Sequence, residues 1–151
     1  MQIIDKYAKM YRVDRELITA IMDHESAFDP SALNPSDPSY GLMQIMVPTA
    51  KQFGYTGKDG SGLFDPETNI SIGTQYIRSL MNQYSDIRDV ISGYNAGPGG
   101  VKHPYINPGY VGKVFSKYTL LRIIGDLNKL IPFAIPIGIL AGFLLIPQDK
   151  K

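Results

Sequence analysis

One glutamate, Glu25, is placed where a carboxyl group could act as both acid and base. It follows Ile21 by four residues and Leu17 by eight in the segment RELITAIMDHES, so a helix there puts all three on one face. A carboxyl group at the rim of an apolar face loses hydration, which raises its pKa. Such a group can hold a proton near neutral pH and donate it. The alternative, a solvated glutamate at a helix end, is the commoner situation.

Two short glycine-bearing motifs, GLMQ and GYNAG, supply side chains suited to a sugar. The amides of Gln44 and Asn95 offer donors and acceptors that match hydroxyl and acetamido groups. Tyr94 offers an aromatic face and a phenolic hydroxyl, and Met43 is an adaptable apolar residue for an irregular groove wall. Either motif alone is also compatible with a helix start or a helix C-terminal cap.

The bulk composition excludes several classes of site. The chain has 151 residues, which is enough for one domain with a hydrophobic core, and a net charge of +1, which gives no reason to expect nucleic-acid binding. It has no cysteine and two histidines, His24 and His103. Thiolate zinc sites and a Ser/His/Asp triad are therefore not expected. We expect no cofactor, no metal and no nucleic-acid partner.

Apolar residues at helical spacing predict a mainly α fold with little or no sheet. A first helix is expected over residues 3–11. Asp14, Asp65 and Asp86 each stand where an N-cap would begin a later helix. A short helix beginning near Pro48 is expected between the first and second of these, because proline suits a first helical turn. The helix after Asp65 has a core-facing stripe at four-residue spacing, formed by Ile72, Tyr76, Leu80 and Tyr84.

Taken together and in this order, these pieces resemble the soluble lytic transglycosylase family of the lysozyme-like superfamily. The resemblance covers residues 14–114. Its motifs are Glu25-Ser26, Phe28-Asp29-Pro30, Gly41-Leu42-Met43-Gln44, Asp65-Pro66 with Asn69-Ile70, Tyr94-Asn95-Ala96-Gly97 and Tyr110-Val111-Gly112-Lys113-Val114.

The resemblance implies a lysozyme-like fold with a groove for a peptidoglycan strand. It implies cleavage of the β-1,4 bond between N-acetylmuramic acid and N-acetylglucosamine, with Glu25 as the sole catalytic carboxylate. Glu25 would protonate the glycosidic oxygen and then act as base while the muramic C6 hydroxyl attacks C1 of its own sugar. The product would be a 1,6-anhydro sugar, and water would not be consumed.

Other residues take roles only by this resemblance. Met43 and Gln44 would line the groove, Tyr94 and Asn95 would lie near the scissile sugar, and Tyr110 would close the site. The residues expected at the substrate-binding site are Ser26, Met43, Gln44, Tyr94, Asn95 and Tyr110. Of these, Ser26 is expected to be a structural partner rather than a nucleophile. The loop SALNPSDPSYGLMQ departs from the family pattern, and Asn34 and Ser39 are the candidates there for a hydrogen bond near the acid.

Three other functions remain open from the residues. A goose-type lysozyme-like hydrolase would need a second carboxylate, and Asp29, Asp37 and Asp65 are the candidates, each of which precedes a proline. An inactive peptidoglycan-binding or structural virion protein would use the groove without cleavage. A membrane-disrupting role for the C-terminal segment is a further alternative.

The composition changes near Thr119, after which apolar residues dominate. The uncharged run LIPFAIPIGILAGFLLI is long enough to predict a transmembrane helix, and the segment before it has apolar residues at helical spacing. We therefore expect four parts: a catalytic domain over 1–116, an amphipathic juxtamembrane linker over 117–129, a transmembrane helix over 130–147 and a polar tail over 148–151.

The expected setting follows from this tail. The N-terminus has no apolar run of signal-peptide length, although peptidoglycan lies outside the cytoplasmic membrane. A phage virion with an internal membrane would resolve this conflict, and a bacterial cell envelope is the alternative. The expected partners are glycan strands, a lipid bilayer and phage structural proteins, and the expected task is local opening of the cell wall as a phage enters.

Overall fold

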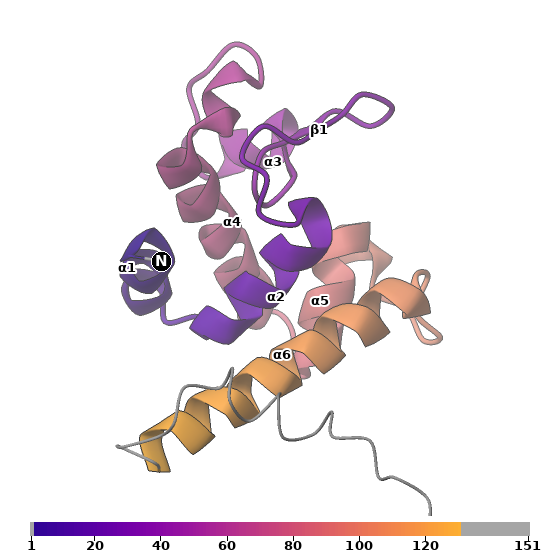
Figure 1. The fold of residues 1–151 in the computed structure, drawn as a ribbon. Helices are drawn as coiled ribbons and strands as arrows, with labels where there is room; N and C mark the ends of the chain where they lie inside the picture. The colour runs from indigo at the N-terminus through magenta and orange to yellow at the C-terminus, as the bar shows by residue number, and fades with distance from the viewer. Residues whose placement is uncertain (1, 131–151) are drawn as a thin grey trace, which may run out of the picture.

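A computed structural model describes residues 2–130 of the chain. Over this range the chain is mainly helical, with one small sheet at one end of the molecule (Figure 1). The α-helices are α1 (Gln2–Tyr11), α2 (Arg15–Ser26), α3 (Val47–Gln52), α4 (Pro66–Met81), α5 (Ile87–Ala96) and α6 (Pro108–Leu130). The 3-10 helices are η1 (Ser61–Phe64) and η2 (Pro98–Gly100).

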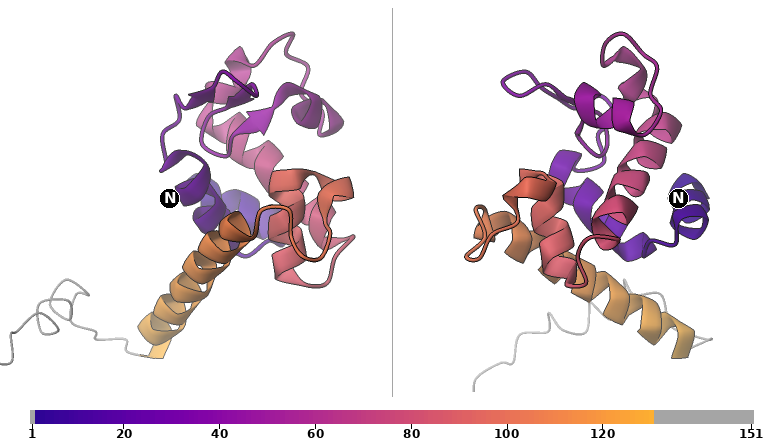
Figure 2. Two further views of the ribbon diagram at one scale, coloured as in Figure 1. Left: turned by 90° about the vertical axis from the view of Figure 1, so that its right-hand side faces the viewer. Right: turned by 180° about the vertical axis from the view of Figure 1, so that it is seen from behind.

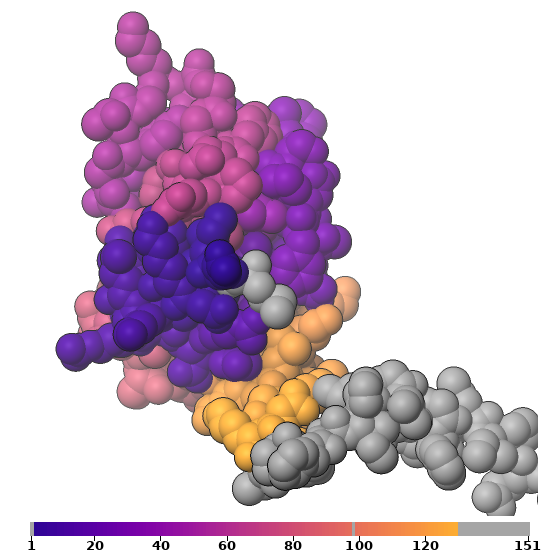
Figure 3. Space-filling model, turned by 60° about the vertical axis from the view of Figure 1, so that its left-hand side comes forward, coloured from indigo at the N-terminus to yellow at the C-terminus, as the bar shows by residue number. Residues whose placement is uncertain are grey.

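The helix α2 lies at the centre of the helical body. It contacts α1 and α6, while α4 contacts α1 and α5, and α5 contacts α6. Figures 1 and 2 show α6 crossing beneath α2 and α5, with the strands at the opposite end of the molecule. In the space-filling view, α1 lies across the front of the body and α6 projects below it (Figure 3).

The apolar face predicted for α2 forms the middle of the core. Leu17, Ile18 and Ile21 are fully buried, and burial of each such side chain contributes about 1.5–3 kcal/mol. The stripe predicted for α4 is buried too, at Ile72 and Leu80. The prediction of a mainly α fold is therefore confirmed.

Two of the three predicted aspartate caps form. The Asp65 carboxylate accepts a hydrogen bond from the Thr68 backbone N–H at 2.8 Å, and Asp86 caps α5 in the same way. Asp14 precedes α2 but makes no side-chain cap. Its carboxylate instead accepts a hydrogen bond from the Tyr118 hydroxyl at 2.6 Å, which ties the start of α2 to α6.

The sheet is small, as predicted. Its strands are β1 (Leu33–Asn34), β2 (Ser39–Tyr40) and β3 (Ile45–Met46). They run antiparallel in the order β1-β2-β3. The register pairs Leu33 with Tyr40, Asn34 with Ser39, Ser39 with Met46 and Tyr40 with Ile45. The turn from β1 to β2 extends away from the body as an exposed hairpin (Figure 1).

A fully buried amide, Asn69 on α4, fixes the turn between β2 and β3. Its Oδ1 accepts from the Met43 backbone N–H at 2.8 Å, and its Nδ2 donates to the carbonyls of Tyr40 and Leu63, each at 2.7 Å. Gly41 has φ +69°, and a Cβ there would lie 2.6 Å from the Leu63 carbonyl oxygen. The close approach of this loop to α4 therefore requires glycine.

The expected transmembrane helix is not supported. The helix α6 runs without a break through residues 117–129, and its last turns carry an arginine, an aspartate and a lysine. Within residues 2–130, no helix is long and apolar enough to cross a membrane, since a span needs about 20 mostly apolar residues. Most of the expected span (131–147) and the polar tail (148–151) lie outside the described residues.

Replacement of Asn69 by alanine is expected to lower the free energy of unfolding by about 3 kcal/mol, because it leaves one buried N–H and two carbonyls without their partner. Chemical denaturation of the full chain measures this change. Asn82→Ala, at the exposed end of α4, should stay within about 0.5 kcal/mol of the parent. Equal effects of the two substitutions would show that the Asn69 amide does not fix the loop.

Candidate active site

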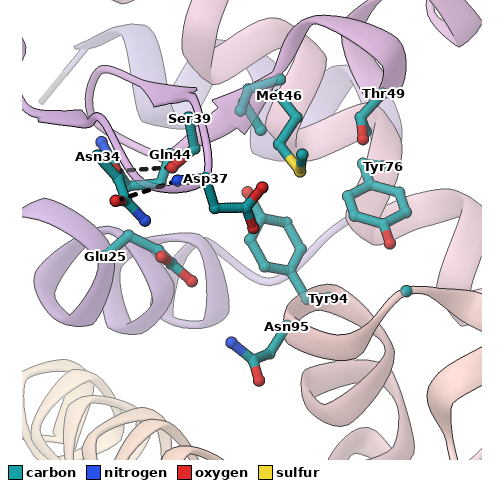
Figure 4. A pocket seen from close by; sticks show the side chains of 12 residues that line it. Glu25, Asn34, Asp37, Ser39, Gln44, Met46, Thr49, Tyr76, Tyr94 and Asn95 are labelled. Carbon is teal, nitrogen blue, oxygen red and sulfur yellow. Dashed lines mark hydrogen bonds between the residues drawn. The ribbon is translucent and has the colours of Figure 1, made fainter.

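The predicted acid, Glu25, lines a pocket between the end of α2, the sheet and α5 (Figure 4). The pocket has a volume of about 230 Å³. Its lining residues are Glu25, Asn34, Asp37, Ser39, Gln44, Ile45, Met46, Thr49, Tyr76, Tyr94, Asn95 and Gly97. Neutral hydrogen-bonding and aromatic side chains dominate this set, which contains no lysine, arginine or histidine, so the pocket suits an uncharged polar ligand.

The environment of Glu25 favours the protonated form of its carboxyl group. Burial raises the pKa of Glu25, and the hydrogen bond from Tyr110 opposes that rise without cancelling it. The Tyr110 hydroxyl donates to Glu25 Oε1 at 2.6 Å, across 85 residues of sequence. The carboxyl group thus meets the physical requirement for a general acid, and one phenol from α6 holds it in place.

The two tyrosines nearest the acid are hydrogen-bond donors rather than bases. Burial and the neighbouring charge of Glu25 raise the pKa of Tyr94 and of Tyr110 well above the usual value for tyrosine. The Tyr94 hydroxyl donates to the Met43 carbonyl at 2.9 Å. Both phenols therefore stay protonated over the ordinary pH range, and Glu25 remains the group suited to proton transfer.

The side chain of Gln44 braces the loop rather than presenting free groups to a ligand. Its Nε2 donates to the carbonyls of Ala32 and Gly41, at 3.1 and 2.9 Å. Its Oε1 accepts from the Ser39 hydroxyl at 2.9 Å. Ser39, a candidate partner of the acid, therefore donates to Gln44 and not to Glu25.

Asn34, the other candidate in this loop, shapes the hairpin between β1 and β2. Its Oδ1 accepts from the backbone N–H groups of Ser36 at 3.2 Å and Asp37 at 3.4 Å. Asn34 also lines the pocket beside Glu25 (Figure 4). The structure brings it close to the acid without a hydrogen bond between the two side chains.

Three predicted site residues, Ser26, Met43 and Tyr110, do not line the pocket. The Met43 side chain is fully buried, and it packs so closely on Gly73 that a Cβ there would lie 2.4 Å from its sulfur. Met43 therefore belongs to the core, which corrects its expected place in the groove wall. The Ser26 hydroxyl donates to the Leu42 carbonyl at 2.8 Å, which joins the end of α2 to the turn between β2 and β3.

Tyr94 and Asn95 line the pocket, and the Tyr110 hydroxyl reaches Glu25. Asp37, considered above only as a second carboxylate, also lines it, and the lining residues that the sequence did not single out are Ile45, Met46, Thr49 and Tyr76. Tyr76 was assigned only to the apolar stripe of α4, and its hydroxyl donates to the Gly93 carbonyl at 3.0 Å. Nothing in its spacing distinguishes it from a core residue.

Metal binding finds no support in the described part of the chain. No three side chains of histidine, cysteine, aspartate or glutamate gather there into a possible metal site. Neither histidine belongs to the pocket lining. His24 contacts the Tyr110 ring edge-on at 4.8 Å between ring centroids, and His103 pairs with Asp89 at 3.2 Å.

Comparison with known families gives one match over most of the chain. The family model described as Transglycosylase SLT domain matches residues 2–110. Membrane-bound lytic murein transglycosylase C of Shigella sonnei is 40% identical over 119 residues, covering 70% of this chain and 33% of that protein. The protein of that name from Yersinia pestis is 42% identical over 115 residues, covering 67% and 32%. The chain thus spans about a third of the length of these relatives.

Solved structures show the same likeness. The 70 kDa soluble lytic transglycosylase of Escherichia coli matches with a TM-score of 0.60 and 33% identity, covering 77% of this chain and 19% of that one. An inactive mutant of lytic transglycosylase Slt from Pseudomonas aeruginosa matches with a TM-score of 0.68 and 27% identity, covering 89% and 24%. Both solved proteins therefore share the fold of this chain over most of its length.

Tyr110→Phe is expected to raise the pKa of Glu25 further, because it removes a hydrogen bond that stabilises the carboxylate. Carbon-13 NMR titration of the Glu25 carboxyl group measures this change. Tyr11→Phe, a change far from the pocket, should leave the titration as it is. A Glu25 pKa that stays the same or falls in Tyr110→Phe would contradict the assigned role of this bond.

Glu25→Gln is expected to stabilise the protein more at pH 7 than at pH 4. Folding raises the pKa of Glu25, so the folded chain binds this proton more tightly than the unfolded chain. That contribution to stability is complete at low pH and is lost as the pH rises through the raised pKa, whereas glutamine has no charge to desolvate. Denaturation of both proteins at several pH values tests this, and a stability difference independent of pH would refute it.

Proposed function

The chain belongs to the transglycosylase SLT domain family, and on that premise we propose that it cleaves peptidoglycan as a lytic transglycosylase. The observation that carries this proposal is the position of Glu25, a partly buried acid with a raised pKa in a pocket of neutral polar side chains. Such an acid can protonate a leaving oxygen. The polar lining suits the hydroxyl and acetamido groups of a glycan.

In the proposed reaction, Glu25 donates its proton to the oxygen that joins N-acetylmuramic acid to N-acetylglucosamine. The bond from C1 of the muramic sugar to that oxygen breaks, and the C6 hydroxyl of the same sugar attacks C1. Glu25, now a carboxylate, takes the proton of that hydroxyl and is restored. One C–O bond breaks and one forms, so the product is a 1,6-anhydro sugar and water is not consumed.

The surroundings of Glu25 support both halves of this cycle. Burial favours the protonated acid that begins the reaction, while the Tyr110 hydroxyl stabilises the carboxylate that follows. The side chains of Gln44 and Tyr94 donate hydrogen bonds to backbone carbonyls and so keep the pocket walls in place. This reduces the reorganisation needed during proton transfer. The same carboxyl group can therefore serve as acid and then as base.

The relatives support the same substrate class. The two relatives compared above carry the name murein transglycosylase, and a 70 kDa soluble lytic transglycosylase has been solved as a complex with bulgecin A. The solved Pseudomonas aeruginosa protein is an inactive mutant in which glutamine replaces a glutamate. The chain spans only about a third of the length of these relatives. The names of the relatives therefore support the proposal for the matched part, and functions of their remaining parts are not proposed for this chain.

Hydrolysis is the second candidate, and one observation favours it. Of the three aspartates considered as a second carboxylate, Asp29 accepts a hydrogen bond within its own loop, Asp65 caps α4, and neither lines the pocket. Asp37 does line it, together with Glu25. The family match favours transglycosylation, and the chemical form of the product distinguishes the two reactions.

The place where the enzyme acts stays a prediction. The relatives from Shigella sonnei and Yersinia pestis are named membrane-bound, which supports a role at the bacterial cell envelope. A virion location, phage structural partners and opening of the wall as a phage enters rest on the sequence argument alone. Detection of the protein in purified virions would support that setting, and its absence from them would exclude it.

Purified peptidoglycan digested with the full chain is expected to release fragments one water lighter than hydrolysis products, as mass spectrometry would show. Glu25→Gln should lower the rate by about 10²–10⁴-fold, because it removes the proton donor. Glu16→Gln, a change of the other glutamate on α2, is the matched control and should keep the parent rate.

Three other results of this digestion would each change the proposed function. Fragments with ordinary reducing ends would replace transglycosylation by hydrolysis. A Glu25→Gln protein as active as the parent would remove Glu25 from catalysis. A folded parent chain that binds peptidoglycan without cleaving it would establish the binding function instead.

A further inference from the structure

The hydrogen bonds of the pocket leave few polar groups free for a ligand. The acceptor of Gln44 is taken by Ser39, and its two donors are taken by backbone carbonyls. The hydroxyls of Tyr76 and Tyr94 donate to backbone carbonyls. These side chains therefore hold the pocket walls together, and the groups free to bind a sugar belong to other lining residues.

Asp37 is a lining residue whose carboxylate acceptors remain free. It lies in the hairpin between β1 and β2, and its carboxylate points into the pocket in front of Tyr94 (Figure 4). No hydrogen bond or ion pair engages this carboxylate anywhere within residues 2–130, although the Asp37 backbone N–H donates to Asn34. Both of its oxygens are free to accept hydrogen bonds.

The hairpin does not need this carboxylate for its own structure. The Asn34 side chain makes the bonds that shape the turn. By contrast, the Asp29 carboxylate accepts from both the backbone N–H and the hydroxyl of Ser31, at 2.8 and 2.7 Å, and so has a local structural role. A free carboxylate that is aimed into a pocket and does not stabilise its own loop is suited to binding a ligand.

We propose that Asp37 is a substrate-binding residue that accepts hydrogen bonds from the hydroxyl or acetamido N–H groups of a sugar beside the scissile bond. This inference rests on the proposed function. Asp37 lines the same pocket as Glu25, and a sugar must occupy that pocket when the acid reaches the glycosidic oxygen. The ligand groups that Asp37 meets are therefore those of the sugar, and sugars are rich in donors.

The free donors of the pocket complement Asp37. The Nδ2 groups of Asn34 and Asn95 make no hydrogen bond within residues 2–130, while the Oδ1 of each accepts one or more. Side-chain donors thus stand on both sides of the acceptor (Figure 4). A sugar with an acetamido group offers the matching pair, a carbonyl acceptor and an N–H donor, whereas a purely anionic ligand would be repelled by Asp37.

The test uses the full chain and two substrates, intact peptidoglycan and glycan strands from which the peptides have been removed. Asp37→Ala should raise KM about tenfold or more on both substrates with kcat changed less than threefold, since it removes a charge-assisted hydrogen bond. Asp37→Asn, which keeps one acceptor oxygen, should have a smaller effect. Ser36→Ala, a neighbouring change outside the pocket, is the control and should match the parent.

Binding is measured directly in a second step, because KM reports affinity only when chemistry is slow. Calorimetry compares the affinity of Glu25→Gln with that of the Glu25→Gln/Asp37→Ala double variant for peptide-free glycan strands. A dissociation constant about tenfold higher in the double variant supports the proposal, and an equal one overturns it. Circular dichroism establishes that each variant is folded.

The remaining outcomes separate failure of this inference from failure of the proposed function. An inactive parent chain would count against the lytic transglycosylase itself. With an active parent, a loss seen only on peptide-bearing substrate would overturn the proposal in favour of recognition of the peptide. A large fall in kcat with KM unchanged would also overturn it, because Asp37 would then act in catalysis.

Discussion

Placing one carboxyl group partly out of water, without losing the fold, is the constraint on which this structure depends. Burial disfavours the charged form of Glu25, so its position costs stability at neutral pH. The apolar face of α2 offsets that cost, because Leu17 and Ile21 precede Glu25 on the same face and are fully buried. The residues that anchor the helix in the core therefore also hold the acid at its rim.

The walls around Glu25 come from segments far apart in the sequence, and buried hydrogen bonds join them. Asn69 on α4 holds the turn between β2 and β3, and Tyr94 on α5 donates to the carbonyl of Met43 in that same turn. Ser26 adds a bond from the end of α2 to Leu42. Three helices thus fix one short loop, whereas the hairpin that carries Asp37 extends outward and is exposed. Rigid walls and an exposed edge follow from how these bonds are distributed.

The sequence predicted the features whose signals are local. The helical spacing of Leu17, Ile21 and Glu25 lies within three turns, and Asp65 is followed at once by the helix it caps. Asp14 has the same local signal but does not cap, because Tyr118 reaches its carboxylate from 104 residues away. Local spacing cannot reveal a competing partner at that distance.

The site was predicted less completely, for the same reason. The GLMQ motif was identified, but its spacing does not tell which side chain faces the groove. That depends on Gly73, whose lack of a side chain admits Met43 to the core. Gln44, with φ +48°, turns back to brace its own loop. The family resemblance supplied Tyr110 as a site residue, and the structure supplies its physical role as a donor to Glu25.

The balance of effects on Glu25 also explains why one carboxyl group can suffice. An acid with a strongly raised pKa gives up its proton poorly, and one with an ordinary pKa is seldom protonated near neutral pH. Burial moves the pKa of Glu25 upward while the hydrogen bond from Tyr110 limits the rise. Burial thus favours the protonated form and the hydrogen bond favours the carboxylate, as a cycle that uses the group first as acid and then as base requires. The position of α6, which brings Tyr110 to Glu25, is therefore part of the chemistry as well as of the fold.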